Sequence, residues 1–164
     1  MQLNDLLIEK GIEPKTVLVL RHRPTEPELR KVLPWLAAEK PDVYNGYQQA
    51  HWLKVEKAMT RALYIASFIG HKPRKALFVG VYKVAGWKEV SFKNYWKIPA
   101  NIELKSFGMT GLSASRSSTL WFDLDIIDIC REWKGKLIVQ WPGLERSWWR
   151  WSDRNKLDIA AILE

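Results

Sequence analysis

The sequence predicts an α+β fold, in which a helical N-terminal layer packs on a small, mostly antiparallel β-barrel. Apolar side chains recur at helical spacing through the first 60 residues, which is typical of amphipathic helices. From residue 61 onward, short apolar runs alternate with turn sequences, which is typical of strands. No repeat or linker divides the 164 residues. We therefore expect one domain over 1–164, with a helix-rich part (1–60) and a β-barrel part (61–164).

Helices are expected at three places in the N-terminal part. Leu3–Lys10 has helical spacing, and the Gly11 that follows it is suited to ending a helix. Thr25–Glu28 resembles a capping box with a proline in the first turn, so a second helix should begin there. Pro34 should kink or split that helix. A third helix is expected from about 42 to 62.

Strands are expected mainly in the second part. The six expected ranges are 17–20, 63–70, 76–84, 119–127, 136–141 and 157–163. His71–Lys75 is turn-like and should join the second and third strands, and Pro99–Phe107 should form one short helix. Asp123 and Asp125 alternate with apolar residues, so they should form the polar face of a half-buried strand.

The charge of the chain favours polyanionic partners. The net charge is +8, from 26 basic and 18 acidic residues. Residues 61–164 carry +7 of this charge and eight of the ten tryptophans. Basic charge and aromatic surface therefore coincide, a combination that nucleic-acid binding uses.

Other features of the sequence indicate the cellular compartment. The single cysteine, Cys130, has no partner for an internal disulfide, fits a reducing compartment and should be buried. The N-terminus has acidic residues within its apolar run, unlike a signal peptide. No apolar stretch approaches the roughly 18 residues that a bilayer span needs. We expect a soluble, cytoplasmic protein with no membrane partner.

The segment Trp141–Arg154 is the most unusual local feature. It holds four tryptophans and three arginines in fourteen residues. Tryptophan can stack on a base, and arginine can hold phosphate oxygens bidentately. The alternative is that alternate tryptophans fill one end of the barrel. Because Trp148 and Trp149 should point to opposite faces of a strand, both interpretations can hold in part.

Basic clusters and a polar loop carry weaker signals. Arg21–Arg23 and His71–Lys75, each taken alone, are expected to be solvated loops. Taken together, they could contribute to a phosphate-facing surface. Ser113–Ser118, which contains Arg116, is either a loop that inserts into a groove or an ordinary surface loop.

Catalytic and metal-binding patterns are weak. Glu103 and Lys105 mimic the end of a metal nuclease site, but they lie on an expected helix without an upstream partner. The three histidines have no zinc spacing, and no glycine-rich phosphate loop is present. We expect no catalytic residue, no metal and no cofactor.

Several segments resemble one protein family. They are Met1–Ile12, Val17–Pro24, Glu28–Leu36, Phe78–Tyr82, Trp121–Leu124, Lys134–Val139 and Glu145–Arg150. Together they resemble the N-terminal, non-nuclease region of bacterial GIY-YIG nuclease family proteins. Gly80–Tyr82 is not half of a GIY-YIG pair, so the resemblance implies a targeting domain without the nuclease module. The region from Phe78 onward also resembles the PUA-like superfamily, which includes EVE, YTH and SRA domains. That likeness implies a pocket for a modified base.

These observations lead to one functional expectation. The chain should be a non-enzymatic DNA-binding targeting domain that reads a methylated base in double-stranded DNA for a modification-dependent restriction endonuclease. A fused or associated nuclease domain would be its partner. The expected base-stacking residues are Trp141, Trp148, Trp149, Trp151, Tyr82 and Trp87. The expected phosphate-binding residues are Lys72, Arg74, Lys75, Arg146, Arg150 and Arg154. The alternatives are a general or RNA-binding module without a modified-base pocket, a small nuclease using Glu103 and Lys105, and a protein-interaction domain.

Overall fold

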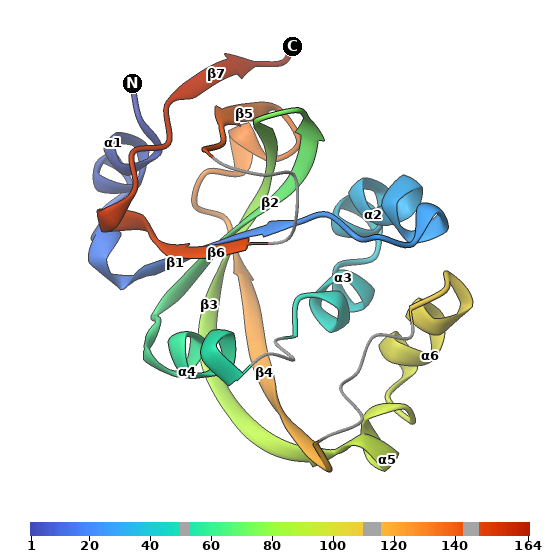
Figure 1. Ribbon diagram of the computed structural model, residues 1–164. Coiled ribbons are helices and arrows are strands. Elements are labelled where there is room, and N and C mark those ends of the chain that lie inside the picture. Colours follow the sequence, from blue (N-terminus) through green and yellow to red (C-terminus); the bar gives the residue numbers. More distant parts are fainter. Residues whose placement is uncertain (50–52, 110–115, 143–147) are drawn as a thin grey trace.

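The computed structural model describes residues 1–49, 53–109, 116–142 and 148–164, and it shows a mixed α+β fold (Figure 1). Seven strands form one sheet, which curls into a half-barrel, and helices lie against it. The elements are, in chain order, α1 (Leu3–Glu9), η1 (Pro14–Thr16), β1 (Val17–His22), α2 (Pro27–Glu39), α3 (Pro41–Tyr47), α4 (Leu53–Arg61), β2 (Tyr64–Lys72), β3 (Lys75–Ser91), α5 (Phe92–Tyr95), α6 (Pro99–Ser106), β4 (Ser118–Ile127), η2 (Arg131–Trp133), β5 (Leu137–Gln140), β6 (Trp148–Trp151), η3 (Ser152–Arg154) and β7 (Ile159–Ile162). The expected α+β class is confirmed.

The sheet is mostly antiparallel, as expected. Its order is β6-β1-β2-β3-β5-β7, and β4 pairs with β3 beside this path. Only β1 and β2 pair in parallel among the paired strands of the described ranges. A parallel pair needs a crossover connection, and α2, α3 and α4 supply it between β1 and β2. Three of the N-terminal helices are therefore a crossover, while α1 precedes β1, and β1 from the helix-rich part lies inside the sheet.

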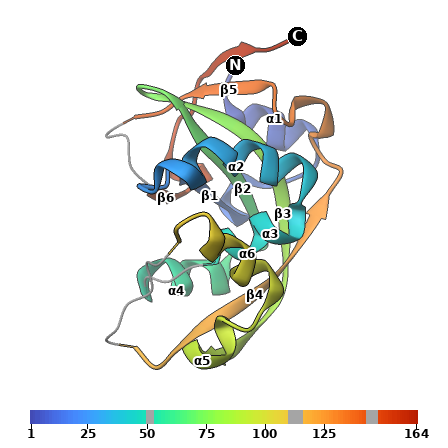
Figure 2. The ribbon, with the colours of Figure 1, turned by 90° about the vertical axis from the view of Figure 1, so that its right-hand side faces the viewer.

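Helices cover both faces of the sheet near β1, so its side chains are buried on either side. Leu18 and Leu20 join the core beneath α2, α3, α4 and α6, while Val17 and Val19 join a second core beneath α1. Figure 2 shows α2, α3 and α6 stacked against one side of the sheet. This double cover explains why an unbroken apolar run, rather than an alternating one, marks β1 in the sequence.

β3 is the longest described strand and changes partner along its length. Its first residues, Lys75–Leu77, pair with β5, and β4 pairs with it only from Val81 onward. Bulges interrupt the register of β3 with both β2 and β4. Because bulges bend and twist a sheet, they account for the curl visible in Figure 1.

The free edge of β4 is covered by side chains instead of another strand. The amide of Gln49 donates to the carbonyl of Phe122 (3.0 Å) and accepts from its N–H (2.7 Å). Asn45 donates to the carbonyl of Leu124 (3.2 Å), and the carboxylate of Glu56 accepts from the N–H of Leu120. These bonds satisfy an edge that could otherwise pair with another chain.

Some helix predictions were wrong. The Thr25–Glu28 capping box is absent, because α2 begins at Pro27 with Glu26 as a cap that makes no side-chain bond. Pro34 does not split α2; it is exposed, where water can satisfy the carbonyl that loses its partner. The single helix expected over 42–62 is two helices, α3 and α4.

The strand predictions fared better. All six expected strands are present, and Asp123 is exposed between buried Phe122 and Leu124, as expected. Asp125 is also exposed, but so is Ile126 after it, and the expected alternation therefore ends at Leu124. Cys130 is buried and free, which confirms that prediction. β6 was missed, and it forms an edge of the sheet through its pairing with β1.

Candidate nucleic-acid interface

The described part of the tryptophan-rich segment forms β6 and η3. β6 runs antiparallel to β1, with Trp149 opposite Leu20 and Trp151 opposite Leu18. Both indoles are partly buried against the core beneath α2 and α4. Arg150, between them, is exposed, and its guanidinium donates to the side-chain oxygen of Asn155 (3.0 Å). Alternation along β6 therefore separates the arginine from these two tryptophans. Arg146 and the side chain of Trp148 lie outside the described residues.

Trp151 and Arg154 line a hollow of about 260 Å³ together with Lys15, Arg61 and Asp153. We call it the basic hollow. Strand direction explains why these residues meet. Lys15 precedes β1 and Arg61 precedes β2, and the two strands are parallel, so both residues lie at the same end of the sheet. β6 is antiparallel to β1 and therefore ends there, which adds Trp151 and the η3 residues.

Positive charge dominates the basic hollow, which has three cations and one carboxylate. Lys15 lies 3.3 Å from the carboxylate of Glu13, an exposed pair that contributes about 1 kcal/mol at most and leaves the ammonium accessible to another anion. The Nε of Arg61 donates to the carbonyl of Lys57 (3.4 Å). Across the described ranges, neither Arg61 nor Arg154 forms an ion pair. Two exposed guanidinium groups are therefore open to an anionic ligand.

The surface continues from the basic hollow toward α1. A second, wider hollow of about 680 Å³ lies between α1 and η1 and shares Lys15 and Asp153 with the first. Its walls include Ile8 and Ile12, which are apolar. Its walls also carry the carboxylates of Glu13 and Asp153, so positive charge does not dominate it as it does the basic hollow.

The hairpin cations lie at the other end of the sheet. Lys72 and Lys75 pair across the tip of the β2–β3 hairpin, and Arg74 lies in its turn with a φ of 60°. β2 has nine residues, so about 30 Å separates this tip from Arg61, at 3.3 Å per residue. The structure thus divides the expected phosphate-binding residues into two groups instead of one surface.

Two of the expected stacking residues are core residues. Tyr82 is fully buried, with its ring centroid 6.4 Å from that of Tyr44. Trp141 is 2% exposed and packs 5.8 Å from the guanidinium of Arg21, with its ring centroid also 5.8 Å from that of Phe68. Neither ring offers an accessible face for a base, so the expectation that they stack on DNA needs correction. Trp87 is 47% exposed, on the part of β3 that pairs with β4, and it does not line the basic hollow.

The expectation that Arg21–Arg23 forms a solvated loop was wrong. Arg21 is 1% exposed and belongs to β1. The Nδ1 of His22 lies 3.0 Å from the hydroxyl of Tyr44, and burial lowers the pKa of this histidine to about 3. His22 is therefore neutral near pH 7 and adds no charge for a phosphate. The sequence signal for this burial was the apolar run at 17–20, because the same strand continues from it into Arg21 and His22.

Lys15 and Arg61 were missed by sequence reasoning. Each is one basic residue in a mixed stretch, and their separation in the sequence is large. The signal that could have found them was the helical connection between the strands at 17–20 and 63–70. Such a connection is typical of a parallel pair, whose starting ends lie together.

The features considered for catalysis are engaged in other contacts. Glu103 on α6 accepts a hydrogen bond from Lys40 (2.5 Å), and the ammonium of Lys105 lies 5.4 Å from the ring centre of Trp96. In the described part of the chain, no three His, Cys, Asp or Glu side chains are placed to hold a metal ion.

No helix within the same ranges is long and apolar enough to span a bilayer. No family model matches the sequence, and neither a curated protein nor a solved structure matches it significantly.

Proposed function

We propose that this chain is a non-enzymatic nucleic-acid-binding module and that the basic hollow is where it holds its ligand. One observation carries the proposal: Lys15, Arg61 and Arg154, from three separate segments, line one hollow together with Trp151 and a single carboxylate, that of Asp153. Lysine and arginine bind phosphates, with release of counterions, and tryptophan stacks on bases irrespective of their identity. A small hollow with both features suits a nucleotide unit of a longer strand.

DNA is the ligand that we propose, because the sequence resembles the N-terminal region of GIY-YIG nuclease family proteins. In this proposal the chain targets a nuclease domain, fused or associated, to DNA. The finer part of the proposal is a preference for a methylated base, whose methyl group adds apolar contact without charge. Since Tyr82 and Trp141 are core residues, this preference would have to come from other aromatic side chains, with Trp151 as the first candidate.

The test compares two tryptophans of the same strand. Trp151→Leu keeps an apolar side chain against the core but removes the aromatic face in the basic hollow. Trp149→Leu is the matched control, because Trp149 packs against the same core but does not line the hollow. Affinity for a fluorescein-labelled DNA strand and for the corresponding duplex is measured by anisotropy, and thermal unfolding checks that both variants fold. Since stacking is worth about 1–3 kcal/mol per base, Trp151→Leu should weaken binding about 5- to 150-fold, and Trp149→Leu should leave it nearly unchanged. Equal losses in both variants would contradict the assignment.

Further ligands in the same assay separate the alternatives. Duplexes with N6-methyladenine, 5-methylcytosine or 5-hydroxymethylcytosine test the modified-base preference against the plain duplex. Tighter binding of RNA than of any DNA would favour the RNA-binding alternative. No salt-dependent binding to any nucleic acid would favour a protein-interaction domain.

A further inference from the structure

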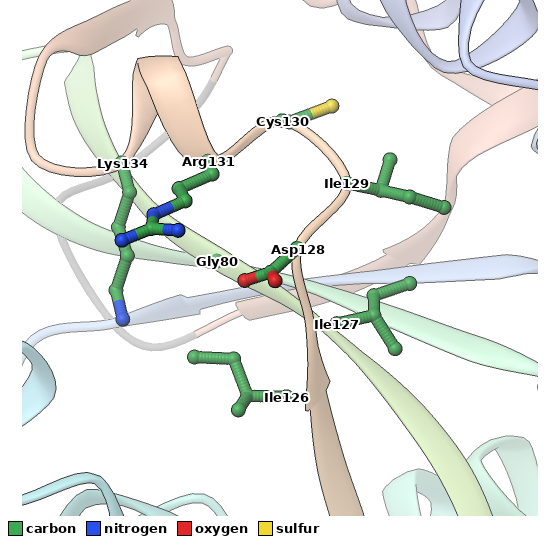
Figure 3. A pocket seen from close by; sticks show the side chains of 8 residues that line it. All are labelled: Gly80, Ile126, Ile127, Asp128, Ile129, Cys130, Arg131 and Lys134. Atoms are coloured by element: carbon green, nitrogen blue, oxygen red, sulfur yellow. The ribbon is translucent and has the colours of Figure 1, made fainter.

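A second hollow lies where β3 changes partner. β5 leaves β3 after Leu77, and β4 joins it at Val81. Between these two residues, β3 has neither β5 nor β4 as a partner. The turn that contains η2 contacts β3 there, since the N–H of Gly135 donates to the carbonyl of Phe78 (2.8 Å). A hollow of about 290 Å³ remains beside this turn (Figure 3). We call it the gap hollow, and it shares no residue with the basic hollow.

Charged side chains from this turn line the gap hollow. Figure 3 shows Arg131 and Lys134 extending along one side of Gly80, and the carboxylate of Asp128 directed toward the same space. Throughout the described ranges, these three side chains make no hydrogen bond or ion pair with protein groups. Two cations and one carboxylate thus face the hollow without a protein partner.

The backbone around the gap hollow is unusual. Cys130, at the start of the turn, is buried in the left-handed region with a φ of 64°, and Gly80 has a φ of 151°. A non-glycine residue is strained in the left-handed region, so the surrounding structure must hold Cys130 there. This turn places Arg131 and Lys134, three residues apart, on the same hollow.

We propose that the gap hollow binds a phosphate monoester with a hydrogen-bond donor near its phosphate, which is the chemistry of a nucleotide. Arg131 can hold two phosphate oxygens, and Lys134 can neutralise the second charge of the dianion. The carboxylate of Asp128 repels a bare anion. It therefore favours a ligand with an N–H or O–H group from which it can accept a hydrogen bond. Ile126, 46% exposed, adds apolar surface for the carbon skeleton. Two sources carry this chemistry: a free mononucleotide and the 5′-phosphorylated end of a strand.

Calorimetric titration of the whole protein tests the proposal. AMP is the probe, with adenosine and inorganic phosphate as comparisons. AMP should bind at least tenfold more tightly than adenosine, and Arg131→Gln and Lys134→Gln should each weaken AMP binding at least tenfold. Lys136→Gln is the matched control, an exposed lysine of the same turn that does not line the hollow, and it should bind AMP normally. Asp128→Asn should lower the ratio of AMP affinity to phosphate affinity.

A second comparison separates the sources. Strands of identical sequence with a 5′-phosphate or a 5′-hydroxyl should differ in affinity if strand ends are the ligand, and Arg131→Gln should abolish that difference. Binding of AMP without such a difference would identify the free nucleotide as the ligand. The proposal is overturned if AMP and the 5′-phosphate both bind no better than their dephosphorylated counterparts, or if Arg131→Gln and Lys136→Gln behave alike. Trp151→Leu should retain AMP binding, so failure of the basic hollow is distinguishable from failure of the gap hollow.

Discussion

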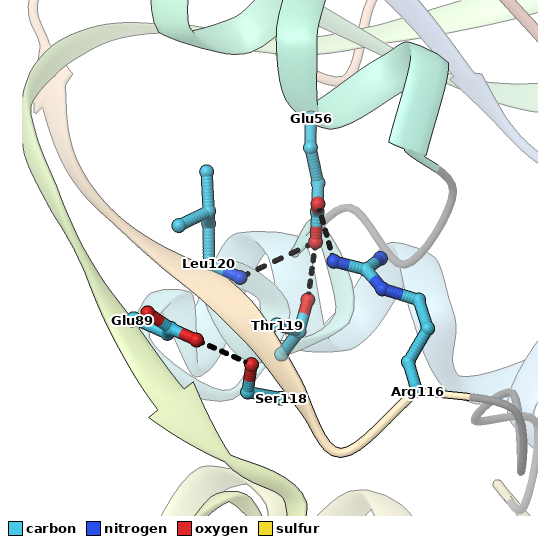
Figure 4. A network of polar contacts seen from close by, with 6 residues as sticks. All are labelled: Glu56, Glu89, Arg116, Ser118, Thr119 and Leu120. Carbon is cyan, nitrogen blue, oxygen red and sulfur yellow. Dashed lines mark hydrogen bonds and ion pairs between the residues drawn. The ribbon is translucent and has the colours of Figure 1, made fainter.

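Loss of the buried carboxylate of Glu56 should destabilise the fold more than loss of any exposed acid near it. Glu56 on α4 is 2% exposed and accepts three hydrogen bonds, from the guanidinium of Arg116 (2.7 Å), the hydroxyl of Thr119 (2.5 Å) and the N–H of Leu120 (3.2 Å) (Figure 4). These bonds attach the start of β4 to α4. Burial alone would raise the pKa of Glu56, but the three hydrogen bonds and the charge of Arg116 outweigh it and lower the pKa.

The expected cost follows from what each substitution leaves behind. Glu56→Ala removes one buried acceptor that the Thr119 hydroxyl, the Leu120 N–H and the Arg116 guanidinium share, so it should cost about 3–5 kcal/mol. For a chain of this size that cost corresponds to a fall of roughly 10 °C in Tm. Glu56→Gln keeps an acceptor but loses the charge, so about 2 kcal/mol is expected.

Urea unfolding followed by circular dichroism measures these costs. Glu89→Ala is the matched control, because Glu89 is exposed and accepts one bond, from the hydroxyl of Ser118 (2.6 Å). It should cost less than about 0.5 kcal/mol. A cost for Glu56→Ala that equals the Glu89→Ala cost would refute the reasoning. Because the pKa of Glu56 is lowered in the fold, its contribution is present above its ordinary pKa. That contribution should disappear as the pH falls through the folded value.

Local sequence patterns predicted most of the strands. The apolar runs that became β1, β2 and the first half of β3 are buried, so their composition alone marks them. β6 could not be found this way, because its four residues pair with a strand far away in the sequence. The split predicted at Pro34 is absent, because α2 continues through this exposed residue, and the sequence does not show that exposure.

The candidate site was predictable only in part. The accumulation of tryptophan and arginine indicated Trp151 and Arg154, since composition reveals which side chains are available. Their neighbours Lys15 and Arg61 come together only through the parallel pairing of β1 with β2. The same limit applies to Trp141, whose burial against Arg21 and Phe68 depends on contacts between distant strands.

Two further predictions concern buried titratable groups. Burial lowers the pKa of His22 to about 3, so the unfolded chain binds one more proton than the folded protein between pH 6.5 and about 3. As the pH is lowered through this range, the free energy of unfolding should therefore fall by up to about 1.4 kcal/mol per pH unit. Urea unfolding across this range should show that component of the slope in the wild type but not in His22→Gln; identical slopes would contradict a neutral buried histidine. Burial also raises the pKa of Cys130 to about 11, so the folded protein should react with Ellman's reagent far more slowly than the urea-unfolded protein. Comparable rates in the two states would show that the thiol is accessible.

The salt dependence of DNA binding tests the basic hollow most directly. If Lys15, Arg61 and Arg154 each contact a phosphate, they contribute about −2.7 to the slope of log K against log salt concentration for a duplex, a loss of about 40-fold between 50 and 200 mM salt. Arg61→Gln and Arg154→Gln should each flatten the slope by about 0.9, while Lys136→Gln should leave it unchanged. A slope that neither arginine substitution alters would contradict the account, because the phosphates would then be bound elsewhere.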